Sequence, residues 1–243
     1  MLRCIRAENR KLRRSAIWLV FLILPLLSAI YGTFNFIQNL GILKREWYYL
    51  WTQHTLFYAT FFFAPLIAVY AAYLWRLEHL GHNWNLIMTA PVPPFQLYFA
   101  KFVVVAKMTL LTQGWVFALF LICGKLWAHI PGWPPVAILL WMLRGFVGGL
   151  VIAALQLLLS MVIRSFSVPV LIALGGGVGG MLFVSKGMGL CWPYALMILG
   201  MNANKTEDMV AGGMLPFFAS CCMFSAVFFG AANRILTKND VRT

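Results

Sequence analysis

The sequence predicts an all-α integral membrane protein with six transmembrane helices. Of its 243 residues, 62% are hydrophobic and only 10% are charged, whereas a soluble domain carries about 25% charged residues. Such a surplus of apolar side chains cannot be buried in one water-soluble core, and lipid is the natural solvent for it. A bilayer core about 30 Å thick requires roughly 20 apolar residues per helix. Six stretches reach or approach this length: residues 15–34, 55–75, 98–124, 136–163, 167–184 and 215–233.

The segment that precedes the first span, residues 1–14, is strongly basic. Leu2, Ile5 and Leu12 fall near one face of a helix drawn through it, which is typical of a helix that lies on the membrane surface. The apolar stretch that follows continues to Phe34 and lacks a convincing cleavage site. It is therefore too long for the core of a signal peptide, and we expect it to stay in the protein as the first span.

Two connections complete the prediction of a single transmembrane domain over residues 1–243. Residues 76–97 join the second and third spans and contain a short amphipathic stretch followed by prolines. Residues 187–200 are apolar but too short to cross a bilayer, and Pro193 interrupts them. We interpret this second segment as a re-entrant or interfacial piece before the sixth span.

The distribution of basic residues predicts that both termini lie in the cytoplasm. Lys and Arg are enriched on the cytoplasmic side of membrane proteins, and this orientation puts twelve of them inside and five outside, with Lys107 and Arg144 embedded. Because the +13 formal charge follows this pattern, it does not indicate nucleic-acid binding. The inner set is Arg3, Arg6, Arg10, Lys11, Arg13, Arg14, Arg76, Lys101, Arg164, Arg234, Lys238 and Arg242, and the outer set is Lys44, Arg45, Lys125, Lys186 and Lys205.

The chain lacks the residue patterns of an enzyme. No GxxxxGK[ST] loop is present to hold nucleotide phosphates, and none of the six acidic residues lies in the middle of a span, which argues against a carboxylate proton relay. His79 and His82 lie close to Glu78, but two histidines do not make a catalytic zinc site. We therefore expect no catalytic residues, no metal and no cofactor in this chain.

One charge lies well inside a span. Arg144 is roughly eight residues, about 12 Å, from the outer end of the fourth helix. Such a charge either reaches outward to the interface or lines a cavity that faces the substrate. Trp47 and Trp51 belong to an aromatic cluster on the outer side, where such rings anchor helices at the interface. These three residues are our candidates for a substrate pathway.

Glycines at four-residue spacing occur in the fourth and fifth spans. Small residues with this spacing let helices approach closely in lipid, where packing drives association. The contact could lie within one subunit or between two subunits, and a hinge in the fifth span is a third interpretation. The glycines concerned are Gly145 and Gly149 in the fourth span, and Gly175, Gly176, Gly179 and Gly180 in the fifth.

The connection between the second and third spans carries a resemblance to a known family. It resembles that of permease subunits of ABC-2-type exporters, in particular lantibiotic-immunity and bacitracin-resistance transporters, whose loop contains a Glu, a Gly, a Trp, a short apolar helix, a Pro and a downstream Lys. The basic N-terminal segment, the six spans and the total length agree with that family as well. The matching positions are Glu78, Gly81, Trp84, Leu86, Ile87, Met88, Pro91 and Lys101.

This resemblance implies a type V exporter-like fold in which residues 76–97 contain a coupling helix that docks on an ATPase. It implies two ATPase chains that bind ATP and Mg, and a second permease that is the same or a homologous chain. The implied location is the cytoplasmic membrane of a bacterium, and the implied cargo is an antimicrobial peptide. Other ABC-2 permeases move lipids, polysaccharides or drugs, and a peptide-sensing accessory subunit is a further alternative. Glu78 could cap the coupling helix, pair with Arg76 or Lys101, or meet a basic residue of the ATPase.

Overall fold

The computed structural model describes residues 1–80, 92–210 and 213–238. Every regular element in these ranges is a helix. Within them, six helical segments are long and apolar enough to cross a membrane, which confirms the expected all-helical class and number of spans. The six are Ile17–Gln38, Trp47–His79, Pro94–Trp127, Val136–Val162, Ser167–Ser185 and Met214–Thr237.

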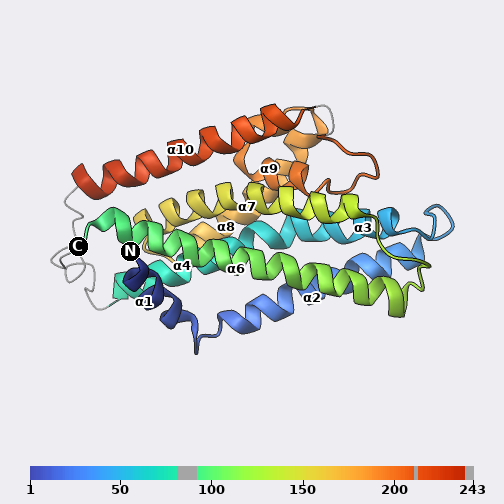
Figure 1. The fold of residues 1–243 in the computed structure, drawn as a ribbon, viewed down its shortest axis with the longest axis horizontal. Coiled ribbons are helices and arrows are strands. Elements are labelled where there is room, and N and C mark those ends of the chain that lie inside the picture. Colours follow the sequence, from blue (N-terminus) through green and yellow to red (C-terminus); the bar gives the residue numbers. More distant parts are fainter. Residues whose placement is uncertain (81–91, 211–212, 239–243) are drawn as a thin grey trace.

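The spans run back and forth, so that the first and last described helices meet the same end of the bundle (Figure 1). We call this end, which carries α1, the α1 end. In chain order the elements are α1 (Leu2–Leu12), α2 (Ile17–Gln38), α3 (Trp47–Phe57), η1 (Tyr58–Phe62), α4 (Phe63–His79), α6 (Pro94–Ile122), η3 (Cys123–Trp127), α7 (Val136–Val162), α8 (Ser167–Ser185), η4 (Gly189–Cys191), α9 (Pro193–Gly200) and α10 (Met214–Lys238).

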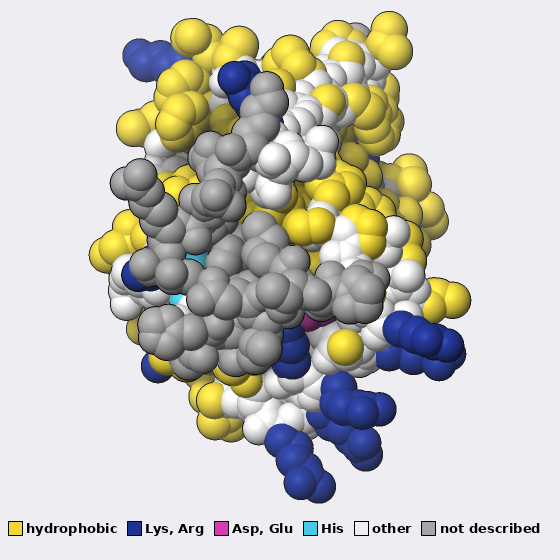
Figure 2. All heavy atoms as spheres, turned by 90° about the vertical axis from the view of Figure 1, so that its left-hand side faces the viewer, with side chains coloured by type: hydrophobic (Ala, Val, Ile, Leu, Met, Phe, Trp, Pro, Cys, Tyr) yellow, Lys and Arg dark blue, Asp and Glu magenta, His cyan; other side chains and the backbone are white. Residues whose placement is uncertain are grey.

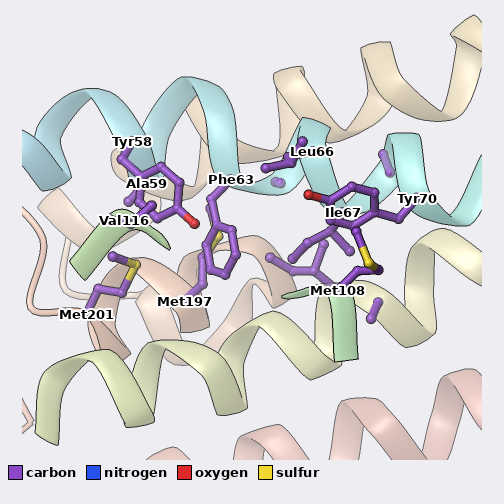
Figure 3. Close-up of a cluster of buried hydrophobic side chains, with 14 of the residues drawn as sticks. Tyr58, Ala59, Phe63, Leu66, Ile67, Tyr70, Met108, Val116, Met197 and Met201 are labelled. Carbon is purple, nitrogen blue, oxygen red and sulfur yellow. The ribbon is translucent and has the colours of Figure 1, made fainter. Parts of the chain in front are cut away.

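Two of the spans form the centre of the bundle. In the most apolar stretch of each span, 72% of the residues are buried in the α3–η1–α4 span and 61% in α7, against 28% in α8 and 17% in α10. A helix that is apolar on all sides and buried on all sides belongs in the interior. The interior contains aromatic side chains of α4, such as Phe63 and Tyr70, packed near Met108 of α6 and Met197 of α9 (Figure 3).

The second span is longer than its apolar stretch predicts, because it begins at Trp47 rather than at residue 55. The additional turns contain polar side chains whose hydrogen-bond partners lie within the bundle. The imidazole Nε2 of His54 and the hydroxyl of Thr33 on α2 are 2.8 Å apart, and the hydroxyl of Thr55 donates to the carbonyl of Trp51 at 2.7 Å. A π-helical turn, Tyr58–Phe62, joins this outer part to α4.

The stretch between the first two predicted spans, residues 35–54, is therefore mostly helical. α2 continues to Gln38 and α3 begins at Trp47, which leaves a short connection between them. Pro94 begins α6 at the other end of the bundle, where proline is well tolerated because the first turn of a helix has no partner for its N–H groups.

Candidate functional site

Four charged side chains from three helices form a buried cluster at the α1 end. Lys101 of α6 lies at its centre and donates to Glu8 of α1 at 2.8 Å and to Glu78 of α4 at 2.7 Å. Lys11 of α1 donates to Glu8 at 2.6 Å and also contacts Glu78. We call these four residues the charge cluster. With two carboxylates and two ammonium groups it is electrically balanced.

The helical period explains how α1 reaches this position. Glu8 and Leu12 are four residues apart and therefore share one face of the helix, and both are buried, with 1% and 2% of their surface exposed. The same face contains Ile5, which packs against the main core. α1 thus packs along α6 through an apolar stripe interrupted by one carboxylate.

Lys101 requires both carboxylates because its side chain is completely buried. An unpaired ammonium group in the interior would cost several kcal/mol, since its hydration is lost. Besides the two ion pairs, Lys101 donates to the carbonyl of Leu74 at 3.2 Å, and its Nζ lies 5.0 Å from the centre of the Trp75 ring. These contacts fix the side chain in one position between α1, α4 and α6.

The pKa of Lys11 is affected by the two carboxylates of the charge cluster. Partial burial of Lys11 would lower its pKa, because burial disfavours the charged form. The carboxylates of Glu8 and Glu78 outweigh this effect and raise the pKa above its ordinary value. The two carboxylates therefore favour the charged form of Lys11.

The charge cluster lies at the base of the connection that carries the family resemblance. Glu78 is in the last turn of α4, and the neighbouring His79 ring lies 3.0 Å from the carbonyl oxygen of Ser160 on α7. Of the alternatives considered for Glu78, the structure shows the pairing with Lys101, whereas a cap on the predicted coupling helix would involve residues outside the described ranges. The remaining residues predicted to couple to an ATPase lie outside the described residues: Gly81, Trp84, Leu86, Ile87, Met88 and Pro91.

A second ion pair lies towards the opposite end of the bundle. Arg144 of α7 donates to Asp208 at 2.8 Å, and the indole N–H of Trp141 donates to the other carboxylate oxygen at 3.0 Å. Asp208 lies in the connection between α9 and α10 and also accepts the backbone N–H of Val210 at 2.9 Å. Arg144 is 5% exposed, and the carboxylate of Asp208 balances its charge.

Asp208 is held in its ionised form. Partial burial would raise its pKa, but the hydrogen bonds from Arg144, Val210 and Trp141 outweigh this effect and lower the pKa below its usual range. The pair ties the connection after α9 to the side of α7. Because 64 residues separate its members, spacing along the chain gave no signal for it.

The two tryptophans proposed for a substrate pathway lie inside the bundle. Trp51 is fully buried and its indole N–H donates to the carbonyl of Met201 at 2.9 Å. Trp47 is 5% exposed and donates to the carbonyl of Pro131 at 3.2 Å. Both rings meet the edge or face of Phe120, at centroid distances of 5.2 and 5.3 Å. Both rings are therefore packed among helices of the bundle rather than exposed on its surface.

The glycines of α7 allow α9 and the start of α4 to pack closely against this central helix. A Cβ atom on Gly145 would lie 2.1 Å from the side chain of Met201, and one on Gly149 would lie 3.1 Å from the ring of Phe63. Gly148, which the spacing analysis did not select, has the backbone of Met197 in α9 at 2.5 Å from the corresponding position.

The glycines of α8 differ strongly from one another. A Cβ atom on Gly176 would lie 2.5 Å from the Tyr194 ring, and one on Gly180 would lie 3.1 Å from the backbone of Ala195. The corresponding atom on Gly179 would be in ordinary contact with Trp192 at 3.9 Å, and Gly175 faces open space. Gly176 and Gly180 thus lie where α8 packs against the Trp192–Ala195 segment, whereas Gly175 lies on an exposed part of the helix.

In the described parts of the chain, no group of three or more His, Cys, Asp or Glu side chains is arranged to hold a metal ion. The polar groups of the bundle are instead arranged as pairs that join helices. A bundle of six apolar spans joined in this way is the architecture of a polytopic membrane protein.

The family follows from comparison with known proteins. The family model described as ABC-2 family transporter protein matches residues 4–180, and the chain therefore belongs to this family. It is a membrane permease, that is, a transport subunit without an ATPase domain, and permeases of this family generally pair with an ABC ATPase. No curated protein and no solved structure matches the chain. The matched region contains the whole charge cluster, whereas α9, α10 and Asp208 lie beyond it.

Proposed function

We propose that this chain is the permease of an exporter that expels antimicrobial peptides of the lantibiotic or bacitracin kind, powered by separate ATPase subunits that bind ATP and Mg. The observation that carries the mechanical part of the proposal is the charge cluster. It joins α1, α4 and α6 where residues 76–97 leave the bundle. The peptide cargo rests on the resemblance of that connection to immunity and resistance exporters.

The charge cluster would transmit movement of the 76–97 connection to the membrane-spanning helices. Glu78 lies at the end of α4 and Lys101 lies in the first turns of α6. Their ion pair therefore joins the two helices that flank residues 76–97. A force that an ATPase applies to a helix in this segment would move α4 and α6 together as one rigid unit. α1 would move with them, because Glu8 and Lys11 belong to the same cluster.

We propose that the α1 end faces the cytoplasm, as the excess of basic residues on that side favours. An ATPase would then meet the 76–97 connection on the side where ATP is present. The proposed re-entrant nature of residues 187–200 is supported by the contacts of Trp192 and Tyr194 with Gly176, which lies in the middle of α8. The chain would enter from the outer side after α8 and return through α9.

The Arg144–Asp208 pair is our candidate for a gate on the outer side. While the pair is closed, the connection after α9 is held against α7 and any route along this face is covered. Transport along α7 would require the pair to open. Trp51 would then contribute by supporting Met201, which lies at the start of that connection, rather than by touching the cargo itself. Trp47 would support the connection before α7 through its hydrogen bond to Pro131.

A second permease, the same chain or a homologous one, is part of the proposed complex. The outward faces of α8 and α10 display large apolar side chains, including Leu171 and Leu182 (both 64% exposed) and Leu215 (82% exposed). These faces are suited to contact lipid or another permease. Gly175, which faces open space, lies on the part of this surface where a second helix could approach closely.

Co-purification with the ATPase tests the coupling part of the proposal. The triple variant Leu86→Ala, Ile87→Ala, Met88→Ala should reduce the amount of ATPase that co-purifies with the permease, because it removes the apolar side of the docking helix. The matched control is Leu139→Ala, Leu140→Ala, Leu143→Ala, which truncates three exposed apolar residues of α7. Undiminished association of the first variant would overturn the docking site.

Peptide-stimulated ATP hydrolysis tests the cargo. The complete complex, reconstituted in liposomes, should hydrolyse ATP faster when a lantibiotic or bacitracin is added, and should reduce the amount of peptide bound to the outer surface. A linear cationic peptide of equal charge is the control for nonspecific membrane effects. Stimulation by a lipid or polysaccharide but not by these peptides would assign the permease to another cargo. Stimulation without removal of peptide would indicate a sensor.

A further inference from the structure

A basic hollow lies on the outside of the α1 end, where α1 meets α2 and α6. Its volume is about 360 Å³, and its lining includes Arg6, Arg10 and Arg13 of α1, Lys107 of α6 and Trp18 of α2. None of the described residues that line it is acidic. Figure 2 shows Lys and Arg side chains gathered on the lower part of this end, at the height where Figure 1 draws α1.

The helical period separates this hollow from the charge cluster. Arg6, Arg10 and Arg13 follow the spacing of one helical face, and all three are exposed, whereas Glu8 and Leu12 lie on the neighbouring, buried face. On the side of α1 that faces the bundle, the charges are therefore balanced within the charge cluster. The other side presents three guanidinium groups that the charge cluster does not compensate.

Lys107 adds a fourth positive charge from another part of the chain. Its ammonium group donates to the Asn9 side chain of α1, so it is directed towards the same hollow. Trp18 closes the third side, and its indole N–H donates to the carbonyl of Leu12 at 2.9 Å. Three helices thus fix the outline of the hollow, and the concentration of positive charge in it favours the binding of an anion.

The surface next to the hollow is apolar. Leu110 and Leu111 lie one turn beyond Lys107 on α6 and are 49% and 44% exposed, and Leu19 and Leu22 of α2 are 61% and 45% exposed. α2 and α6 are in contact here, because the indole N–H of Trp115 donates to the carbonyl of Leu22 at 3.4 Å. A basic hollow therefore continues into an exposed apolar surface formed by two membrane-spanning helices.

We propose that this hollow binds the phosphate of an anionic phospholipid whose acyl chains lie along α2 and α6. A free phosphate would use the basic part and leave the apolar part uncovered. A phospholipid satisfies both parts with one molecule, and basic pockets beside membrane-spanning helices are suited to such headgroups. The bound lipid would hold the outer side of α1 in place while the charge cluster holds its inner side.

The test measures lipid retention by the full chain purified in detergent. The protein is incubated with mixed micelles that contain phosphatidylglycerol and phosphatidylcholine in equal amounts, and the lipids that remain bound are counted by native mass spectrometry. We expect selective retention of phosphatidylglycerol, and a loss of about fivefold in its affinity for Arg10→Gln and for Lys107→Gln. Lys107→Arg should keep the affinity, because the charge is conserved.

Arg3→Gln is the matched control, since Arg3 is a basic residue of the same helix that does not line the hollow. An equal loss in this variant would overturn the site in favour of general attraction between α1 and the membrane. Full displacement of phosphatidylglycerol by millimolar inorganic phosphate would assign the hollow to a free anion. A melting temperature measured without anionic lipid controls for folding, and equal retention of the two lipids by the native protein would overturn the proposal.

Discussion

Lys101 of α6 and Glu8 of α1 form a buried ion pair at 2.8 Å although 93 residues separate them in sequence. This pair, completed by Glu78, converts a basic N-terminal segment into a fixed part of the bundle. A helix held only by the membrane surface could tilt and slide, whereas α1 is fastened to the two helices that flank the 76–97 connection. A movement of the 76–97 connection, where we propose that the ATPase docks, would therefore also move α1.

The first prediction concerns the central lysine. Lys101→Met should lower the free energy of unfolding by about 3–5 kcal/mol, because it leaves the carboxylates of Glu8 and Glu78 buried beside each other with one fewer cation. Denaturant titration in detergent measures the change. Lys186→Met is the control, since Lys186 is exposed in the connection after α8 and its replacement should change stability by less than about 0.5 kcal/mol. Equal effects would contradict the charge cluster.

The second prediction concerns the attachment of α1. Glu8→Gln removes the carboxylate that both Lys101 and Lys11 contact, so α1 should detach more often while the six spans stay folded. Hydrogen exchange of the backbone amides in Leu2–Leu12 should accelerate by about tenfold, since local opening reports local stability. Glu46→Gln, at an exposed acid beside α3, is the matched control. Unchanged exchange in α1 would show that apolar packing alone holds this helix.

The third prediction concerns pH and the Arg144–Asp208 pair. The folded state lowers the pKa of Asp208, so the pair contributes its full stability above the unfolded value, about 3.9, and loses it as the pH falls through the lower folded value. Asp208→Asn should therefore lower the free energy of unfolding by about 1–2 kcal/mol at neutral pH. The effect is modest because 27% of the Asp208 side chain is exposed, so solvent screens the pair. The difference from the native protein should shrink in acid.

Glu207→Gln controls for this measurement, because Glu207 is the preceding residue and is exposed. Its effect on stability should be small across the whole range. Thermal unfolding followed at a series of pH values from neutral to below the ordinary pKa of aspartate distinguishes the two variants. A difference between Asp208→Asn and the native protein that stays constant into acid would mean that the carboxylate charge does not stabilise this connection.

The six spans could be predicted from sequence because each contains enough apolar residues to cross lipid, and lipid tolerates little else. The ends of the spans that lie away from the α1 end could not be predicted in the same way. Thr52 and His54 are polar and end an apolar stretch by composition, yet both are buried, and His54 finds its partner Thr33 on another helix. Whether a polar side chain ends a span depends on such a partner, which local composition does not reveal.

Some of the charged pairs could be predicted from sequence, and others could not. Glu78 and Lys101 flank one connection, so their pairing could be considered from sequence. Glu8 carried a weaker signal, as the one acid among six basic residues before the first span, in register with Ile5 and Leu12. Asp208 carried none, because its partner Arg144 lies on a different helix and only the folding of the α9–α10 connection brings them together.

The last prediction separates two neighbouring glycines of α8. A Cβ atom on Gly177 would lie 2.6 Å from the carbonyl oxygen of Thr60 in η1. Because a backbone carbonyl cannot move aside as a flexible side chain can, Gly177→Ala should destabilise the bundle by about 1–3 kcal/mol. Gly175 faces open space, so Gly175→Ala should be neutral or stabilise the helix by up to about 1 kcal/mol.

Thermal unfolding of both variants in the same detergent measures this contrast, and the two substitutions add the same methyl group two residues apart. If both lowered the melting temperature equally, the close contact between α8 and η1 would be contradicted. If Gly175→Ala instead left the isolated chain unchanged but reduced association between two permeases, the exposed face of α8 would be a contact surface between subunits. The glycines of α8 would then serve two different contacts: Gly177 within the chain and Gly175 between chains.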